Sequence, residues 1–312
     1  MPEPEPENNY NHSHSETGHS HDFTVLSGKK IFWVTVLNAA ITAAEIIGGL
    51  LSGSLALMSD AIHNLSDSVA IAMSYIANRI ARKPKDAKRT YGYKRAEILS
   101  AFVNSGVLLA ISAILIIEAI KRIKSPEPIN GTLMITVAII GLVADLLSVY
   151  LLEKDSHDSL NIKSSYLHMI SDTVSSVGVI AGGIAIKIWG IVWIDPLITV
   201  LISLYILFET WQVMKKAVAI LMQSSAVLDY EAIKEDIEKL DLVKDIHHVH
   251  SWMSDEKTIY FEAHIDMEDV LLSDAEKVYD KIELLLTEHY GISHITLQAE
   301  VDKCGNKSMF KS

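Results

Sequence analysis

The sequence predicts an α-helical membrane protein with six transmembrane helices followed by a small α+β domain. Three observations lead to this prediction. The 312 residues are 49% hydrophobic and only 21% charged, which is rich in apolar residues and poor in charge for a water-soluble protein. The charged residues gather at the N-terminus, between apolar runs and after residue 222. Each apolar run has roughly the 20 residues that a helix needs to cross the hydrocarbon core of a bilayer.

The elements follow in chain order. Residues 1–28 open with Pro-Glu repeats and are too polar to form a core, so we expect this tail to be disordered. Six apolar runs come next, and turn-forming residues such as Gly53, Pro126 and Gly190 lie in the short breaks between them. The predicted transmembrane domain covers residues 29–222, and its runs are 31–51, 55–77, 98–120, 129–152, 165–188 and 196–222.

Residues 223–312 are predicted to form a separate domain. Apolar residues at helical spacing favour helices, and alternation of apolar with polar residues favours strands. The expected order is helix 230–240, strand 243–252, strand 258–267, helix 273–289 and strand 292–301. This α-β-β-α-β order predicts one sheet packed against two helices.

Basic residues in the loops predict how the chain is oriented. The break between the second and third runs is the most basic, and cytoplasmic loops carry an excess of Lys and Arg. This break is therefore expected in the cytoplasm, together with both termini, in a multi-pass protein of the cell (inner) membrane. Its basic residues are Arg79, Arg82, Lys83, Lys85, Lys88, Arg89, Lys94 and Arg95.

Overall charge and cysteine usage exclude some classes of function. The formal net charge is -12, which argues against a nucleic-acid partner because phosphate binding needs clustered cations. A single cysteine, Cys304, rules out an intramolecular disulfide and fits a reducing compartment.

Two pairs of ionisable residues lie inside apolar runs, where such side chains are costly. His63 and Asp67 are four residues apart in the second run, and His168 and Asp172 have the same spacing in the fifth. Residues four apart share one face of a helix. Two such faces would bring together two imidazoles and two carboxylates, a ligand set that suits tetrahedral zinc. The alternative is that each pair is only a buried hydrogen-bonded contact between helices.

Asp60 precedes His63 by three residues and lies on nearly the same face of the predicted helix. It is expected to orient a metal ligand from behind or to line the path to the site, because four ligands are already present.

Two further groups of histidines lie outside the apolar runs. His247, His264 and Glu300 fall on the three predicted strands, so a metal site across neighbouring strands is one reading, and surface histidines at a sheet edge is the other. Strand alternation places His248 on the opposite face from His247. The N-terminal His12, His14, His19 and His21 form two His-x-His pairs, which would bind zinc loosely.

Four segments resemble the cation diffusion facilitator family, particularly its bacterial zinc and cobalt–zinc–cadmium resistance branch. They are EIIGG at 45–49, SLALMSDAIHNLSD at 54–67, YGYKRAE at 91–97 and DIHHVHSW at 245–252. The resemblance covers nearly all of residues 29–302. It implies a homodimeric six-helix exporter with a metallochaperone-like cytoplasmic domain that exchanges cytoplasmic zinc for external protons.

The resemblance also implies roles for particular residues. His63, Asp67, His168 and Asp172 match the family's transport site, and His247, His264 and Glu300 match the metal site of its cytoplasmic domain. Zinc is then the transported substrate and a possible regulatory ligand. Some members bind metal at a loop site that would need histidines near positions 89 and 93. This chain has Arg89 and Tyr93 there, so no metal is expected in that loop.

Competing functions remain for the same residues. Zinc needs neutral imidazole and ionised carboxylate, so zinc and protons would exclude one another at one site, as antiport requires. A metallohydrolase needs an open coordination position, and four protein ligands leave none, so we expect no enzyme activity. A zinc sensor that moves no metal, and an exporter whose main substrate is Co²⁺ or Cd²⁺, are the alternatives.

Overall fold

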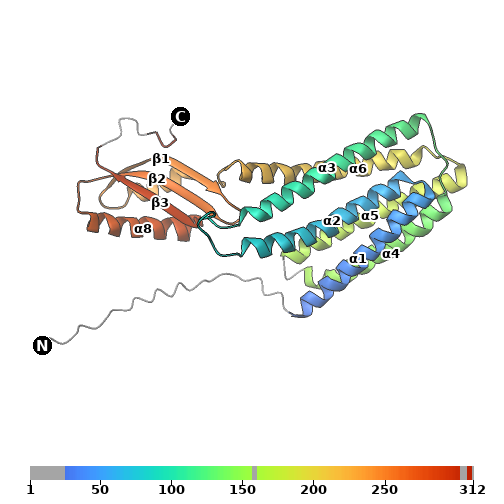
Figure 1. Ribbon diagram of the computed structural model, residues 1–312, viewed down its shortest axis with the longest axis horizontal. Coiled ribbons are helices and arrows are strands. Elements are labelled where there is room, and N and C mark those ends of the chain that lie inside the picture. The colour runs from blue at the N-terminus through green and yellow to red at the C-terminus, as the bar shows by residue number, and fades with distance from the viewer. Residues whose placement is uncertain (1–24, 157–159, 303–307, 311–312) are drawn as a thin grey trace.

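The computed structural model describes residues 25–156, 160–302 and 308–310, without the side chains of residues 25–35, 37, 38 and 151–168. The predicted disordered tail lies almost wholly outside this part of the chain, as do its four histidines. Six long helices and a smaller unit with one sheet make up the described chain (Figure 1). The long helices are α1 Val25–Ser52, α2 Leu55–Ala81, α3 Arg95–Lys124, α4 Gly131–Ser156, α5 Leu160–Trp189 and α6 Ile194–Leu221.

The long helices coincide with the six predicted apolar runs and extend beyond most of their ends. Within the described residues, four of them contain a segment that is long and apolar enough to cross a membrane. These segments are Arg95–Lys124, Gly131–Tyr150, Met169–Trp189 and Ile194–Leu221. Helix α1 offers a shorter apolar stretch, Ala39–Ser52. Helix α2 contains no segment that is apolar enough by this measure, because Asp60, His63 and Asp67 lower its hydropathy.

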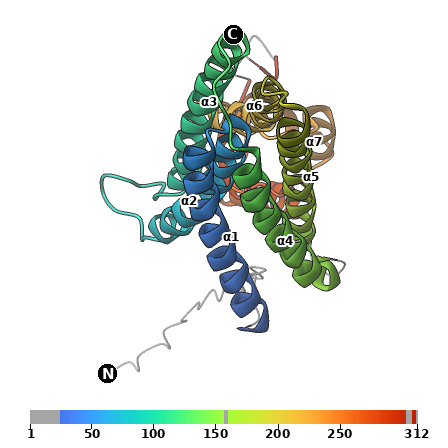
Figure 2. The ribbon, with the colours of Figure 1, turned by 90° about the vertical axis from the view of Figure 1, so that its right-hand side faces the viewer.

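The helices pack as two groups. Helix α3 lies mainly against α6, whereas α4 lies mainly against α5 and α1, and α2 contacts both groups (Figures 1 and 2). Glycine permits the close approach of α4 to α5: a Cβ atom at Gly183 would lie 2.7 Å from Cγ1 of Ile135. Gly53, with φ of 74°, turns the chain between α1 and α2.

The start of α2 is fixed to the start of α6. Ser54 caps α2 by accepting a hydrogen bond from the backbone N–H of Leu57 at 3.1 Å. The buried carboxylate of Asp195 in α6 accepts the Ser54 hydroxyl hydrogen. It also accepts the N–H groups of Leu55 at 2.9 Å and Ala56 at 3.2 Å. An anion is therefore held against the positive end of the α2 dipole.

The smaller unit has the predicted α-β-β-α-β order. Its elements are α7 Tyr230–Glu238, β1 Val243–Met253, β2 Ile259–Met267, α8 Leu272–Tyr290 and β3 His294–Glu300. Strand β2 is central, antiparallel to β1 and parallel to β3. The core of the unit is apolar and includes Ile237, Phe261 and Ile282. Because β1 and β2 pair with His247 opposite His264, the register brings these two rings to one face of the sheet.

The sheet unit contacts one end of the helix bundle (Figure 1). Met253 at the end of β1 packs against the cluster of Ile98 in α3 and Ile220 in α6. In the loop before α3, Lys94 donates a hydrogen bond to the Thr258 hydroxyl at 2.8 Å, and the Tyr91 ring lies edge-on to Tyr260. The loop that precedes α3 and the end of α6 are thereby held against the sheet unit.

Candidate metal sites

Three of the four residues predicted to bind metal in the helix bundle lie together. Nε2 of His63 is 3.7 Å from Oδ2 of Asp67, one turn further along α2. The same nitrogen is 3.5 Å from Oδ1 of Asp172 in α5. His63 and Asp172 are 8% and 4% exposed. The side chain of His168 lies outside the described residues, although its backbone is in α5, four residues before Asp172.

The two carboxylates approach His63 from different sides. The potential ligand atoms of His63, Asp67 and Asp172 do not all lie within 4.8 Å of one another. Among the described residues, a group of three that meets this limit is found only in the sheet unit. A metal ion bridging His63, Asp67 and Asp172 would therefore require one carboxylate to move closer. Buried carboxylates and imidazoles in apolar helices are rare and costly, so their convergence makes this cluster a candidate metal site.

Asp60 lies behind this cluster. It is 3% exposed and accepts a hydrogen bond from the Ser175 hydroxyl of α5 at 2.7 Å. Ser175 is one turn from Asp172, so the bond fixes the relative position of α2 and α5 at the level of the site. This contact fits the orienting role predicted for Asp60 better than direct ligation.

Further buried polar contacts surround the cluster. The Asn64 amide donates to Oε2 of Glu45 in α1 at 2.9 Å. The Ser176 hydroxyl donates to Oδ2 of Asp145 in α4 at 3.1 Å. These bonds join α1, α2, α4 and α5 around the site, and they account for carboxyl groups that would otherwise be isolated in apolar surroundings.

A cavity of about 260 Å³ reaches His63 and Asp67 from one side. Its walls come from α2, α3 and α6, and all of its lining residues lie between His63 and the ends of these helices that face the sheet unit. The lining comprises His63, Asp67, Ala70, Ser74, Ser100, Ala101, Asn104, Ser105, Leu108, Ile206, Glu209, Thr210 and Val213. The cavity thus extends from His63 toward the side of the sheet unit.

Glu209 in this wall was missed by the sequence reasoning. It accepts a hydrogen bond from the Tyr205 hydroxyl at 2.8 Å, and that hydroxyl is 2.7 Å from the Ser171 hydroxyl, next to Asp172. The available signal was a carboxylate inside the sixth apolar run, which carries the same cost as the pairs that were recognised.

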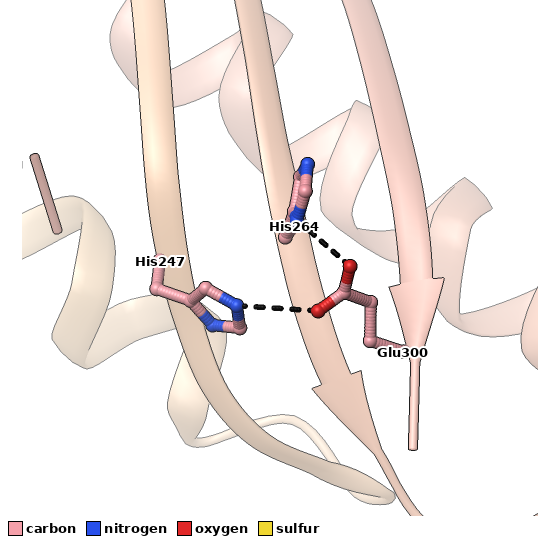
Figure 3. Close-up of side chains that lie close together, drawn as sticks. All are labelled: His247, His264 and Glu300. Atoms are coloured by element: carbon pink, nitrogen blue, oxygen red, sulfur yellow. Dashed lines mark ion pairs between the residues drawn. The ribbon is translucent and has the colours of Figure 1, made fainter. Parts of the chain in front are cut away.

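A second group of possible metal ligands lies on the sheet. His247, His264 and Glu300 point toward one another from β1, β2 and β3 (Figure 3). Oε1 of Glu300 is 2.9 Å from Nδ1 of His264, and Oε2 is 3.4 Å from Nε2 of His247. Among the described residues, neither nitrogen of the buried His247 ring has a hydrogen bond of normal geometry. A cation bound by Nε2 of His247 and by Glu300 would satisfy that nitrogen, whereas Nδ1 of the same ring faces Asp245.

Two neighbours modify this sheet site. Oδ2 of Asp245 is 3.3 Å from Nδ1 of His247, and its other oxygen is 2.6 Å from the Lys234 ammonium. The prediction for His248 was wrong: its ring centroid is 4.5 Å from that of His264. The cause is a bulge in β1 between His247 and His250, where His248 has φ of 52° and simple alternation fails.

Comparison with known proteins places the chain in a family. The cation efflux transmembrane domain matches residues 31–222, and the cation efflux protein cytoplasmic domain matches residues 227–302. The metal cation efflux system protein CzcD of Cupriavidus metallidurans is 36% identical over 288 residues, 92% of this chain and 91% of that protein. The cadmium, cobalt and zinc/H(+)-K(+) antiporter of Bacillus subtilis is 37% identical over 290 residues, 91% and 92% of the two chains.

The zinc transporter ZitB of Escherichia coli is 34% identical over 293 residues, covering 92% of this chain and 93% of the relative. The family resemblance inferred from the sequence motifs is therefore confirmed, and the apolar helices belong to a multi-pass membrane domain. The chain is a member of the cation efflux family, with a transmembrane domain followed by a cytoplasmic domain.

Proposed function

We propose that this protein exports Zn²⁺ from the cytoplasm in exchange for H⁺, with His63, Asp67, His168 and Asp172 as the transport site. One observation carries the proposal: His63 lies within 3.7 Å of a carboxylate on its own helix and of another on α5, at the wall of a cavity on the cytoplasmic-domain side. Imidazole nitrogen and carboxylate oxygen form a ligand set that zinc accepts. The relatives include a protein named as a zinc transporter, which agrees with this substrate.

The chemistry of the site supplies the exchange. Zinc requires the imidazole nitrogens unprotonated and the carboxylates ionised. Protons require the same lone pairs, so one site holds either zinc or protons. Zinc that enters through the cavity displaces protons, and protons from the other side displace zinc once the site opens there. Asp60 holds the α2 ligands in register with α5 during this exchange through its bond to Ser175.

The proposal includes an arrangement in the membrane. All six long helices span the bilayer, including the more polar α2, whose charged face is covered by its neighbours. The termini and the sheet unit lie in the cytoplasm of a cell whose inner membrane holds the protein. Two copies associate as a homodimer through their cytoplasmic domains. Loading of His247, His264 and Glu300 with zinc favours the state with the cavity open to the cytoplasm, which makes this second site regulatory.

No enzymatic activity is part of this proposal. Four ligands at the membrane site leave no open position for a metal-bound nucleophile. Two other functions compete within metal binding: export of Co²⁺ or Cd²⁺ as the main substrate, and zinc sensing without transport. The second is favoured by the sheet site, whose geometry is the more compact of the two.

Flux through sealed vesicles tests the proposal. The full-length protein is reconstituted with an imposed pH gradient, and zinc movement is compared for the parent, Asp172→Asn and the matched control Glu118→Gln. The control removes a half-exposed carboxylate that pairs with Lys121 and does not line the cavity. We expect zinc to move against the proton gradient in the parent and control but not in Asp172→Asn. Equal flux in all three would show that the site is wrongly assigned. Zinc binding without flux in any of them would favour the sensor.

A further inference from the structure

The loop between α2 and α3 carries an unusual concentration of positive charge. Residues 79–95 contain eight Lys and Arg residues against one acidic residue, Asp86, in a chain whose formal net charge is -12. None of the metal chemistry above uses these cations. Their function is the open question, because like charges held close together repel one another unless a partner offsets them.

The loop has an ordered structure, and its single acidic residue, Asp86, bonds to other residues of the loop. Asp86 accepts hydrogen bonds from the Tyr93 hydroxyl at 2.7 Å and from the backbone N–H groups of Lys88 and Arg89, both at 2.8 Å. The Arg89 guanidinium lies 4.8 Å from the centre of the Tyr93 ring. Arg89 and Tyr93 stand at the two positions where a metal site in this loop would need histidines. Here they stabilise a turn that presents cations.

Six of the eight cations have no ion-pair partner among the described residues, and all six are exposed. Only Arg89, over Tyr93, and Lys94, which lies 4.0 Å from Asp255, are engaged. The unpaired residues are Arg79, Arg82, Lys83, Lys85, Lys88 and Arg95. The end of the loop next to α3 is held against the sheet unit by Lys94 and Tyr91. The exposed cations therefore lie on a loop that is fixed at both ends, by α2 and by the sheet unit.

Position along α2 places these cations at the membrane boundary. Ile71, Tyr75 and Ile76 form an exposed apolar and aromatic surface, 55%, 71% and 57% exposed, of the kind that faces lipid. Tyrosine is enriched where hydrocarbon meets headgroups. Arg79 follows Tyr75 by one turn, and Arg82 lies about 10 Å further along the axis than Tyr75 at 1.5 Å per residue. The headgroup layer on each side of a bilayer is about 5–7 Å thick, so Arg79, about 6 Å beyond Tyr75, lies within this layer and Arg82 lies at its outer surface.

The loop also extends in the right direction to reach lipid. Viewed along the long axis, the segment drawn in teal between α2 and α3 extends sideways beyond α2 instead of folding back over the bundle (Figure 2). A surface that extends laterally at headgroup depth meets the bilayer around the protein. The partner whose chemistry fits it is an array of phosphates with net negative charge.

We propose that residues 79–88 form a binding surface for anionic phospholipid headgroups of the cytoplasmic leaflet. Basic clusters beside a transmembrane helix gain affinity for anionic lipid with each added cation, roughly fivefold per residue near the surface. The proposal does not depend on which metal the protein carries. The competing occupant is the acidic cytoplasmic domain of a second copy, and the test distinguishes the two.

The test compares two triple variants of the full-length protein in detergent micelles. Lys83→Gln, Lys85→Gln and Lys88→Gln together remove three free cations of the loop. The matched control, Lys257→Gln, Lys277→Gln and Lys281→Gln, removes three exposed lysines of the sheet unit. Native mass spectrometry counts bound phosphatidylglycerol and phosphatidylcholine during titration, and it reports the monomer and dimer populations in the same spectra.

The parent and the control should bind phosphatidylglycerol in preference to phosphatidylcholine. In the loop variant, affinity for phosphatidylglycerol should fall at least about tenfold. Three cations at roughly fivefold each would give a larger loss without salt, and screening reduces it. Binding of phosphatidylcholine should not change. Equal phosphatidylglycerol binding in parent and loop variant would overturn the proposal. So would loss of the dimer with unchanged lipid binding, which would assign the loop to a second copy. Displacement of the lipid by an equal concentration of inorganic phosphate would likewise count against a headgroup surface.

Discussion

The carboxylate of Asp245 offers a sharp test of the proposed sheet site, because it lies beside His247, one of the three proposed ligands, on the opposite side of the ring from Glu300. It lies 3.3 Å from Nδ1 of His247, while Nε2 of that ring faces Glu300. A carboxylate behind a metal-bound imidazole fixes the ring and raises its basicity, and removing such a partner costs about 10- to 100-fold in metal affinity. Asp245→Asn keeps the shape of the side chain and removes its charge.

The contacts of Asp245 narrow the expected loss of zinc affinity. A separation of 3.3 Å is long for a hydrogen bond, and part of the carboxylate charge is neutralised by the Lys234 ammonium at 2.6 Å. The loss should therefore lie near the lower limit, about tenfold or about 1.4 kcal/mol. The variant does not leave Lys234 isolated, because Glu238 lies 3.2 Å from its ammonium group.

The assay is zinc competition against a chromogenic chelator, with the full-length protein carrying Asp172→Asn in both arms to weaken the membrane site. Asp236→Asn is the matched control, because Asp236 lies on α7 and bonds to Lys239 and Tyr290 instead of facing the ligands. Unchanged zinc affinity in Asp245→Asn, or an equal loss in the control, would refute the role given to Asp245.

The pH range of that assay follows from Lys234. Burial disfavours its charged form, but the bonds to Asp245 and Glu238 outweigh burial and raise its pKa. A raised pKa means that the stabilising contribution of the ammonium is fully present below its unfolded value, near 10.4, and is lost as the pH rises through the folded value. The Lys234 ammonium is therefore fully charged between about pH 6 and pH 8, so its own contribution does not vary across the range of the assay.

Three further outcomes are expected. Asp195→Asn should lower the stability of the membrane domain by about 2–3 kcal/mol, measured by thermal unfolding in micelles, because the N–H groups of Leu55 and Ala56 lose a charged acceptor. Ile282→Ala should destabilise the sheet unit by about 2–5 kcal/mol in chemical unfolding, since this side chain is fully buried in its core; a change under about 0.5 kcal/mol would contradict the packing. Glu209→Gln should slow zinc flux at low zinc with little effect at saturation, because the cavity wall loses a negative charge that concentrates cations.

Local patterns predicted much of this protein. The spacing of His63 and Asp67 was sufficient to place both on one face, because four residues on a helix fix their direction whatever the helix packs against. Apolar run length likewise predicted the six long helices, and alternation predicted the strands that carry His264 and Glu300. The proximity of His63 to Asp172 was predicted because the same His-x-x-x-Asp spacing occurs in two helices, and the packing of those helices was not considered.

Other features depended on contacts between distant segments. The cavity lies between α2, α3 and α6, and no single helix encodes that space. His248 was misplaced because a bulge inserts residues into β1, and its effect on direction requires knowledge of the pairing with β2. The bond from Ser175 to Asp60 joins residues 115 positions apart, so its donor was unpredictable even though the cost of burying Asp60 was clear.

The anchoring of α2 by Asp195 makes the helix a lever with its pivot at one end. Helix α2 has 27 residues, a length of about 40 Å at 1.5 Å per residue. A tilt of about 10° about Leu55 would move the far end by about 7 Å but move His63, only about 12 Å from the pivot, by about 2 Å. The cavity end of α2 would thus move more than three times as far as His63. A shift of about 2 Å still exceeds the tolerance of a metal–ligand distance, about 0.2 Å, so the same tilt that changes access would also change how His63 meets Asp172 of α5.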